Sequence, residues 1–500
     1  MTTTREAPTL VEDPALGPGV KSQRSWLWRL VMYGLVLLAL FIIFGSASNM
    51  GVGGGVIMLM LVLLALKMPI ALTMLLPSTL GLVVMYGFET AAELVGHTAY
   101  AEAASWSLSV VPMFIFMGLM LWRSGMTTEL FAAMTILFNR VPASLAVGTN
   151  MAGGGLAAVS GSTVGVTYAL ARIGIPEMLK AGYDKRMATS SVLMAGLAGQ
   201  LIPPSILLVI YAGLASVPVG PQLLAGVVPG IFLVLTQCVA LIAMAVVWPR
   251  LVGGRDHAIS RQREVATIPA REKLQAIIRV WPVPVITLIV LGGMFTGTLT
   301  ETEAGAAGAL AALLLTVVRQ GRKAFGMIKV AVVEAATATA TVLFLLMGAA
   351  VISLVMSDTG LADALSTWIL DSGFSRVQFL LIILVAYLLL GMIGETLVAM
   401  MLTVPILLPL FETLGIDALW FGVFAVLCVE LGMVLPPVGI LVYVVHGIAQ
   451  DPEVNMGQKI TLKDAFTGVG WLLPISLFVI AVLIAFPEMA TWLPNRGSLE

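Results

Sequence analysis

Charged side chains are scarce in this chain of 500 residues, because Asp, Glu, Lys and Arg together make up only 11% of it. Soluble globular domains carry about a quarter charged residues, so the composition excludes an ordinary soluble protein. The 26 basic and 27 acidic side chains give a net charge of −1, which excludes the basic surface of a nucleic-acid-binding protein. We therefore expect no nucleic-acid partner.

Cysteine and histidine are also rare. Cys238 and Cys428 lie in apolar runs without a Cys-x-x-Cys pattern, and the three histidines are scattered, so neither a disulfide framework nor a zinc site is expected. No HExxH, GxSxG, SxxK or Walker motif is present. We predict that the protein is not an enzyme, and that any transport it performs is driven by an ion gradient or a partner.

Apolar residues are abundant instead, at 59% of the chain with a mean hydropathy of +1.03. We predict an all-α, multi-pass protein of the lipid bilayer. A spanning helix needs about 20 apolar residues, which leaves room for roughly a dozen spans and several shorter segments that cannot cross. Among these shorter segments we place 110–122.

Polar and basic stretches divide the chain. The segment 250–279 carries seven Lys or Arg residues against three acidic ones, which places it in the cytoplasm by the positive-inside rule. The predicted parts are a disordered cytoplasmic tail (1–25), an extra N-terminal membrane helix (26–50), a first repeat with scaffold helices and a hairpin (51–249), a basic cytoplasmic linker (250–279), a second repeat with scaffold helices and a hairpin (280–490) and a C-terminal tail (491–500).

Two similar motifs indicate that the chain is built from two repeats. Gly199-Gln-Leu-Ile-Pro-Pro-Ser205 returns as Gly432-Met-Val-Leu-Pro-Pro-Val438, 233 residues later. The same offset places Gly161 on Gly394, Thr163 on Thr396, and Asp184 on Asp417. Two consecutive prolines unwind a helix, and matching interruptions in two halves are typical of a transporter binding site. The alternative is a simple proline kink at a helix contact. We expect the repeats to be inverted.

The segment Val141–Ile175 is rich in Gly, Ala, Ser and Thr. We predict a re-entrant helical hairpin here, with its tip at Ser160–Thr163 near the middle of the bilayer, because each flank is only about half a bilayer long at 1.5 Å per residue. Its counterpart in the second repeat has the tip Gly394-Glu-Thr-Leu397. An ordinary contact between helices with small residues is the alternative.

A broken helix beside a hairpin tip offers carbonyl and hydroxyl oxygens, which are ligands for a hard cation such as Na⁺. Two sodium sites related by the repeat would lie on either side of one solute site. The predicted ion ligands are Ser160, Gly161, Ser162, Gly199, Ile202 and Pro204 in the first repeat, and Gly394, Glu395, Thr396, Gly432, Leu435 and Pro437 in the second. The predicted solute-binding residues are Ser162, Thr163, Ser205, Glu395 and Thr396. Proton coupling through Glu395 or Glu430 is an alternative.

The sequence resembles the large membrane subunit of the tripartite ATP-independent periplasmic (TRAP) transporters, within the wider ion-transporter superfamily. The motifs that carry the resemblance include Ser160-Gly-Ser162, Leu201-Ile-Pro-Pro-Ser205, Thr302-Glu-Ala304 and Pro436-Pro-Val-Gly439. The resemblance implies an elevator-type secondary transporter of the bacterial inner membrane, driven by sodium, that imports a small organic acid such as a carboxylate. It also implies two partners, a periplasmic substrate-binding protein and a small four-helix membrane subunit. The family's first sodium site corresponds here to Ser160, Gly199, Ile202 and Pro204.

This chain departs from the family's pattern at two places. The tip of the second hairpin is Glu395-Thr-Leu397 where Asp-Ser-Leu is usual, and Glu301 replaces a usual proline. A stand-alone carboxylate or ion transporter of the same superfamily, coupled to sodium or protons, is the main alternative function. An intramembrane enzyme or a scaffold protein is a more distant one.

Overall fold

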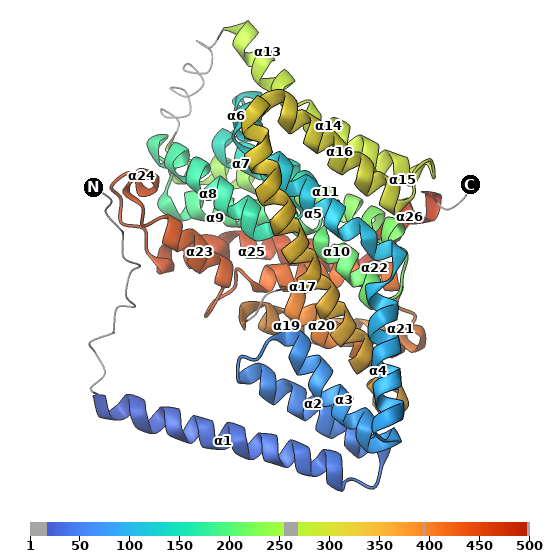
Figure 1. The fold of residues 1–500 in the computed structure, drawn as a ribbon. Helices are drawn as coiled ribbons and strands as arrows, with labels where there is room; N and C mark the ends of the chain where they lie inside the picture. The colour runs from blue at the N-terminus through green and yellow to red at the C-terminus, as the bar shows by residue number, and fades with distance from the viewer. Residues whose placement is uncertain (1–17, 255–268, 394–395, 498–500) are drawn as a thin grey trace, which may run out of the picture.

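The computed structural model describes residues 18–254, 269–393 and 396–497, and over these ranges the chain is helical without a β-strand (Figure 1). Six helical stretches are long and apolar enough to cross a membrane. One of these stretches holds two helices, and several further apolar helices are only 10–17 residues long, so the number of spans stays a prediction. The six are Trp28–Gly45, Trp106–Arg123, Val219–Val247, Ala270–Phe295, Glu301–Asp358 and Leu462–Ala485.

The helices follow the order that the hydrophobic runs predict. Up to the basic linker they are α1 (Pro18–Gly45), α2 (Asn49–Ala65), α3 (Ile70–Tyr86), α4 (Phe88–Ala103), α5 (Val110–Arg123), α6 (Met126–Leu137), α7 (Ser144–Ser160), α8 (Thr163–Lys180), α9 (Lys185–Leu197), α10 (Ile206–Leu214) and α11 (Val219–Val247). After it they are α13 (Ala270–Arg279), α14 (Pro282–Thr287), α15 (Gly293–Phe295), α16 (Glu301–Gln320), α17 (Ala324–Asp358), α18 (Leu361–Asp371), α19 (Arg376–Ile393), α20 (Thr396–Leu407), α21 (Pro409–Leu414), α22 (Ala418–Gly432), α23 (Ile440–Ile448), α24 (Pro452–Asn455), α25 (Leu462–Ala485) and α26 (Glu488–Gly497).

The two broken helices, α9–α10 and α22–α23, run in opposite directions. The end of α10 lies against the start of α22, because the Tyr211 hydroxyl donates to the Ala418 carbonyl at 2.7 Å. The start of α9 lies beside the segment after α23, because Lys185 Nζ donates to the Lys459 carbonyl at 2.8 Å. An inverted repeat produces this antiparallel arrangement.

A long oblique helix, α17, connects the N-terminal helices to the centre of the molecule (Figure 1). It contacts α3, α4 and α5 on one side and α10 and α20 on the other. Helices α1, α2 and α3 pack on one another below it, away from α8 and α9. The extra N-terminal helix therefore packs on α2 and α3 at the edge of the fold.

Two helices begin in ways that their apolar runs alone do not predict. The segment 110–122 is too short to cross alone, but a 3₁₀ turn at Trp106–Ser109 precedes α5 and the two together are long enough. Thr300 caps α16, and residues 301–303 form its first turn. The Thr300 hydroxyl accepts from the Glu303 amide at 3.3 Å, and the Glu303 carboxylate accepts from the Thr300 amide at 2.9 Å, which is a capping box.

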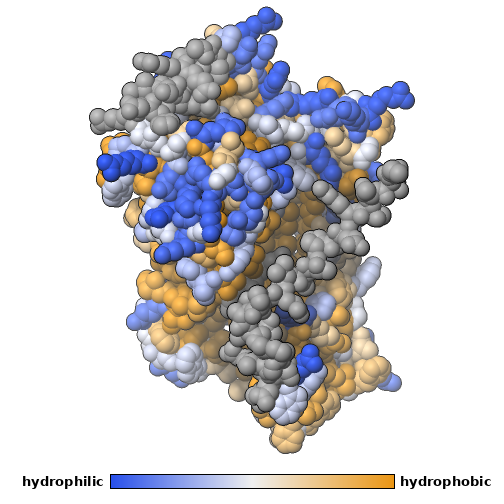
Figure 2. Space-filling model, turned by 90° about the vertical axis from the view of Figure 1, so that its left-hand side faces the viewer, coloured by the Kyte–Doolittle hydropathy of each residue, from blue (hydrophilic) through white to orange (hydrophobic). Residues whose placement is uncertain are grey.

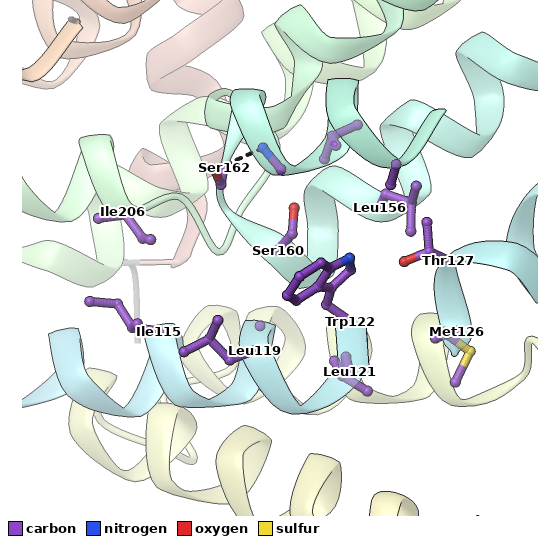
Figure 3. Close-up of a pocket in the computed structure, with 14 residues that line it drawn as sticks. Ile115, Leu119, Leu121, Trp122, Met126, Thr127, Leu156, Ser160, Ser162 and Ile206 are labelled. Atoms are coloured by element: carbon purple, nitrogen blue, oxygen red, sulfur yellow. Dashed lines mark hydrogen bonds between the residues drawn. The ribbon is translucent and has the colours of Figure 1, made fainter. Parts of the chain in front are cut away.

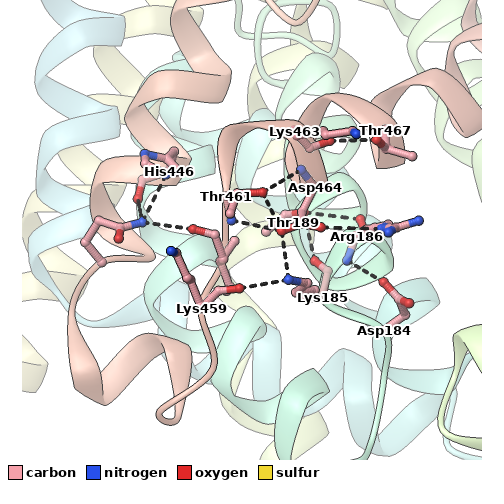
Figure 4. A network of polar contacts seen from close by, with 12 residues as sticks. Asp184, Lys185, Arg186, Thr189, His446, Lys459, Thr461, Lys463, Asp464 and Thr467 are labelled. Atoms are coloured by element: carbon pink, nitrogen blue, oxygen red, sulfur yellow. Dashed lines mark hydrogen bonds and ion pairs between the residues drawn. The ribbon is translucent and has the colours of Figure 1, made fainter. Parts of the chain in front are cut away.

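The outer surface is divided between polar and apolar regions. On the face of Figure 2, hydrophilic residues gather in the upper half and hydrophobic residues cover much of the lower half. Figure 2 shows the side of the molecule that lies at the left in Figure 1, where α8 and α9 are found. A polar network fixes that end: Asp464 of α25 pairs with Lys185 Nζ at 2.9 Å and with Arg186 Nε at 3.4 Å (Figure 4).

Candidate ion and solute site

The first hairpin has the predicted form, with α7 and α8 joined by a two-residue tip at Gly161 and Ser162. Gly161 ends α7 in the left-handed conformation, with φ of 56°, which residues with a Cβ adopt only at a cost. Ser162 begins α8, because its hydroxyl accepts a hydrogen bond from the Gly165 amide at 3.2 Å. The residues at the tip are therefore those that a chain reversal between two helices requires.

The first break lies between Gln200 and Ile206, where neither α9 nor α10 continues. Pro203 and Pro204 are joined by a cis peptide bond, as are Pro436 and Pro437 in the second repeat. Ser205 is fully buried and begins α10, since its hydroxyl accepts from the Leu208 amide at 3.2 Å and donates to the Gln200 carbonyl.

The hairpin tip and the break touch each other, although the contacting residues are 36 and 43 positions apart in the chain. A Cβ on Gly161 would lie 2.8 Å from the Pro204 carbonyl oxygen, and a Cβ on Gly199 would lie 2.9 Å from Thr163 Cα. Such approaches are closer than real Cβ atoms make. Both positions therefore require glycine, and residues predicted as one ligand set come together.

Polar oxygens at this contact lack partners. Ser160 Oγ and Thr163 Oγ1 are buried without a hydrogen-bond partner in the described part of the chain. Buried polar atoms nearly always have one. Hydroxyl and carbonyl oxygens are what a hard cation prefers, and among the described residues no group of three or more His, Cys, Asp or Glu side chains could hold a metal ion. This donor set fits Na⁺.

The second repeat brings its residues together differently. Gly432 packs against the hairpin helix α19, because a Cβ there would lie 2.7 Å from the Leu388 carbonyl oxygen. Pro437 is exposed and Leu435 is half-buried, whereas Pro204 is buried. Gly394 and Glu395, predicted as ligands of the second ion, lie outside the described residues, so their place in the site stays a prediction. The two breaks thus differ in exposure.

A cavity of about 290 Å³ lies beside the first hairpin tip (Figure 3). Ser160, Ser162 and Thr127 supply its hydroxyl groups. Its other walls come from α5, α6, α7, α8 and α10 and are apolar, with Ile115, Leu119, Leu121, Trp122, Met126, Leu156, Val166, Ala169 and Ile206 among them. The hydroxyl groups of Ser160 and Ser162 lie at the tip side of the cavity (Figure 3).

The predicted solute-binding residues have separate positions. Ser162 lines the cavity, whereas Thr163 and Thr396 are buried and Ser205 begins α10. The sequence comparison of the two repeats did not include Glu430 among the predicted ligands. From the sequence, Glu430 was named only as a carboxylate that could carry a proton. The Thr396 hydroxyl donates to its Oε1 at 2.9 Å. The signal that could have identified Glu430 as a site residue is its position as a charged residue within an apolar run.

A hairpin tip that meets a broken helix inside an apolar helical bundle is typical of a membrane transport protein. The fold itself is shared with a solved structure: a chain of the crystal structure of the Alcanivorax borkumensis YdaH transporter matches with a TM-score of 0.56, at 14% sequence identity, over 82% of this chain and 91% of that one. At this identity the likeness concerns the fold alone.

The family follows from the sequence. A family model described as "Tripartite ATP-independent periplasmic transporter, DctM component" matches residues 57–489, so the chain belongs to this family. It is 30% identical over 396 residues to the sialic acid TRAP transporter large permease protein SiaM of Vibrio cholerae, covering 78% of this chain and 87% of the relative. It is 28% identical over 460 residues to the C4-dicarboxylate TRAP transporter large permease protein DctM of Rhodobacter capsulatus, covering 87% and 97%. The family consists of transporter permeases, so the protein is a TRAP transporter large permease and not an enzyme.

Proposed function

We propose that this permease imports a small organic acid by coupling its movement to sodium, and that it depends on a binding protein. The observation that supports this most is the contact between the tip Gly161–Ser162 and the break at Pro204, with unpartnered hydroxyl oxygens beside it. Relatives are named for sialic acid and C4-dicarboxylates, which are organic acids.

Sodium would be held in the first repeat by the Ser160 hydroxyl and by backbone carbonyls of the break, with Gly199, Ile202 and Pro204 the candidates. A bound cation there would offset carbonyls that no helix satisfies. The remaining first-repeat candidates, Gly161 and Ser162, form the tip itself. A second sodium ion would lie at the second break, among Thr396, Gly432, Leu435 and Pro437.

The solute would enter the cavity beside the first tip. Ser162 stands there at the start of α8, an 18-residue helix, and the positive end of a helix dipole favours an anion. The apolar walls would contact the carbon skeleton of the solute. Ion and solute would thus share the tip, which is what coupling requires: occupation by one improves binding of the other.

The translocation step would be an elevator movement of the two hairpins with their broken helices against the other helices. A periplasmic binding protein would deliver the solute, and a small four-helix membrane subunit would complete the scaffold. Both are proposed as separate chains, and the assembly is placed in the bacterial inner membrane. A relative named as an isethionate TRAP transporter permease protein DctMQ matches 74% of this chain, and the match covers only 56% of that relative's length.

The test is solute uptake into liposomes that contain this chain and the small subunit. We expect uptake only with an inward sodium gradient and the cognate binding protein. Ser160→Ala should abolish it, whereas Ser191→Ala should not, since Ser191 is buried in α9 with its hydroxyl bonded to the Met187 carbonyl at 2.7 Å. Uptake without sodium would refute the coupling. Uptake without the binding protein would indicate a stand-alone transporter.

A further inference from the structure

Glu430 is a buried carboxylate without a basic partner in the described part of the chain. It lies in α22, and 1% of its surface is exposed. Its Oε1 accepts the hydrogen bond from Thr396, while its Oε2 has no hydrogen-bond partner among the described residues. The ion pairs formed by described residues do not include it. The charge of this group is therefore not compensated by the residues that the structure describes.

The first residues of two helices, α8 and α20, lie near this carboxylate. Thr396 is the first residue of α20, and Thr163, its equivalent under the 233-residue offset, is the first residue of α8. The Thr163 side chain also lies near the Glu430 carboxylate. Thr163 Oγ1 and Glu430 Oε2 are both buried atoms without a hydrogen-bond partner among the described residues. Two unsatisfied oxygens thus lie close to the starts of α8 and α20.

An ionised carboxylate in an apolar interior is strongly unfavourable unless a positive charge accompanies it. Hydroxyl and carboxylate oxygens together are suitable ligands for a hard cation. The repeat adds an asymmetry, because the position equivalent to Glu430 in the first half is Leu197. A negative side chain is thus present at one of the two related positions.

We propose that Glu430, with the hydroxyls of Thr163 and Thr396, holds a sodium ion between the starts of α8 and α20. The inference rests on the proposed sodium coupling. It moves the second ion site away from the exposed Pro437 to the buried side chains of Glu430, Thr163 and Thr396. The carboxylate neutralises this ion. At the first break the predicted ligands are neutral oxygens, so the positive charge of an ion bound there is not neutralised by its ligands.

The experiment uses the full-length chain in detergent and measures thermal unfolding by tryptophan fluorescence, with sodium chloride exchanged for choline chloride at constant ionic strength. Sodium should raise the unfolding temperature of the wild type. In Glu430→Gln we expect the half-saturating sodium concentration to rise by about tenfold or more, because the charge that attracts the ion is lost. Glu430→Asp keeps the charge and should remain closer to the wild type.

The matched control is Glu412→Gln, an exposed carboxylate of α21 in the same repeat, which should leave the sodium response unchanged. A wild-type response in Glu430→Gln, with a weakened one in Ser160→Ala, would overturn the inference and leave the sodium coupling intact. Should Glu430→Gln not fold, Thr163→Val removes one ligand at nearly constant volume, and a wild-type response there would equally overturn it.

Two further outcomes separate this inference from the proposed function. A wild type stabilised by acid and not by sodium would assign Glu430 to a proton and overturn the sodium site. A wild type that shows neither stabilisation by sodium nor sodium-driven uptake would refute the proposed coupling itself.

Discussion

Replacing Gly161 by alanine tests whether the hairpin tip must touch the helix break. The new methyl group would meet two obstacles. The backbone has φ of 56°, where a residue with a Cβ costs about 1–2 kcal/mol. The methyl group would also lie 2.8 Å from the Pro204 carbonyl oxygen, and such overpacking costs typically about 1–3 kcal/mol.

A second glycine separates these two effects. Gly415 ends α21 with φ of 60°, and a Cβ there would meet nothing within 4 Å. Gly415→Ala therefore carries the backbone cost alone. The difference between the two variants is the contact with Pro204, about 1–3 kcal/mol, which corresponds to about a 5- to 150-fold change in an equilibrium constant.

The assay is the sodium dependence of solute uptake into liposomes, together with the unfolding temperature of each variant. Relief of the clash displaces the Pro204 carbonyl from the tip, so Gly161→Ala should raise the half-saturating sodium concentration within that range. Gly415→Ala should alter the unfolding temperature and leave the sodium dependence near the wild type. Equal sodium dependence in both variants would refute the reasoning, because it would mean that the contact between tip and break does not shape the ion site.

Two further predictions concern stability. Asp464→Asn removes the charge that Lys185 and Arg186 share. We expect a loss of about 1.5–3 kcal/mol, the range for hydrogen bonds to charged groups, seen as a lower unfolding temperature. No change would show that the network is only a surface contact. Tyr211→Phe removes the hydrogen bond to the Ala418 carbonyl and should cost about 1 kcal/mol. Unchanged stability would mean that water replaces the hydroxyl.

The hairpin and the broken helix of the first half could be predicted from the sequence because the residues that end their helices are local signals. Two prolines in succession and the glycines of the tip are set by backbone geometry, so α7, α8, α9 and α10 could be placed within a few residues. Gly161 and Gly199 also allow the hairpin tip and the break to approach each other, because a Cβ at either position would collide with the opposite segment.

Other features depend on contacts that no local pattern encodes. The predicted role of Ser205 in solute binding did not anticipate its use as the N-terminal cap of α10, where its hydroxyl both accepts and donates a hydrogen bond. The position of Glu430 beside Thr396 joins residues 34 positions apart on different helices. The unequal exposure of Pro204 and Pro437 is invisible to a repeat comparison, which treats the halves as equal.

The length of α17 has a consequence for the surrounding membrane. Its 35 residues extend for roughly 50 Å at 1.5 Å per residue, whereas the hydrocarbon layer is about 30 Å thick. The helix must therefore tilt or project beyond the lipid, at a cost that depends on this mismatch in length. Because α17 contacts α20, a change in the thickness of the bilayer would also act on a helix of the part that we propose to move.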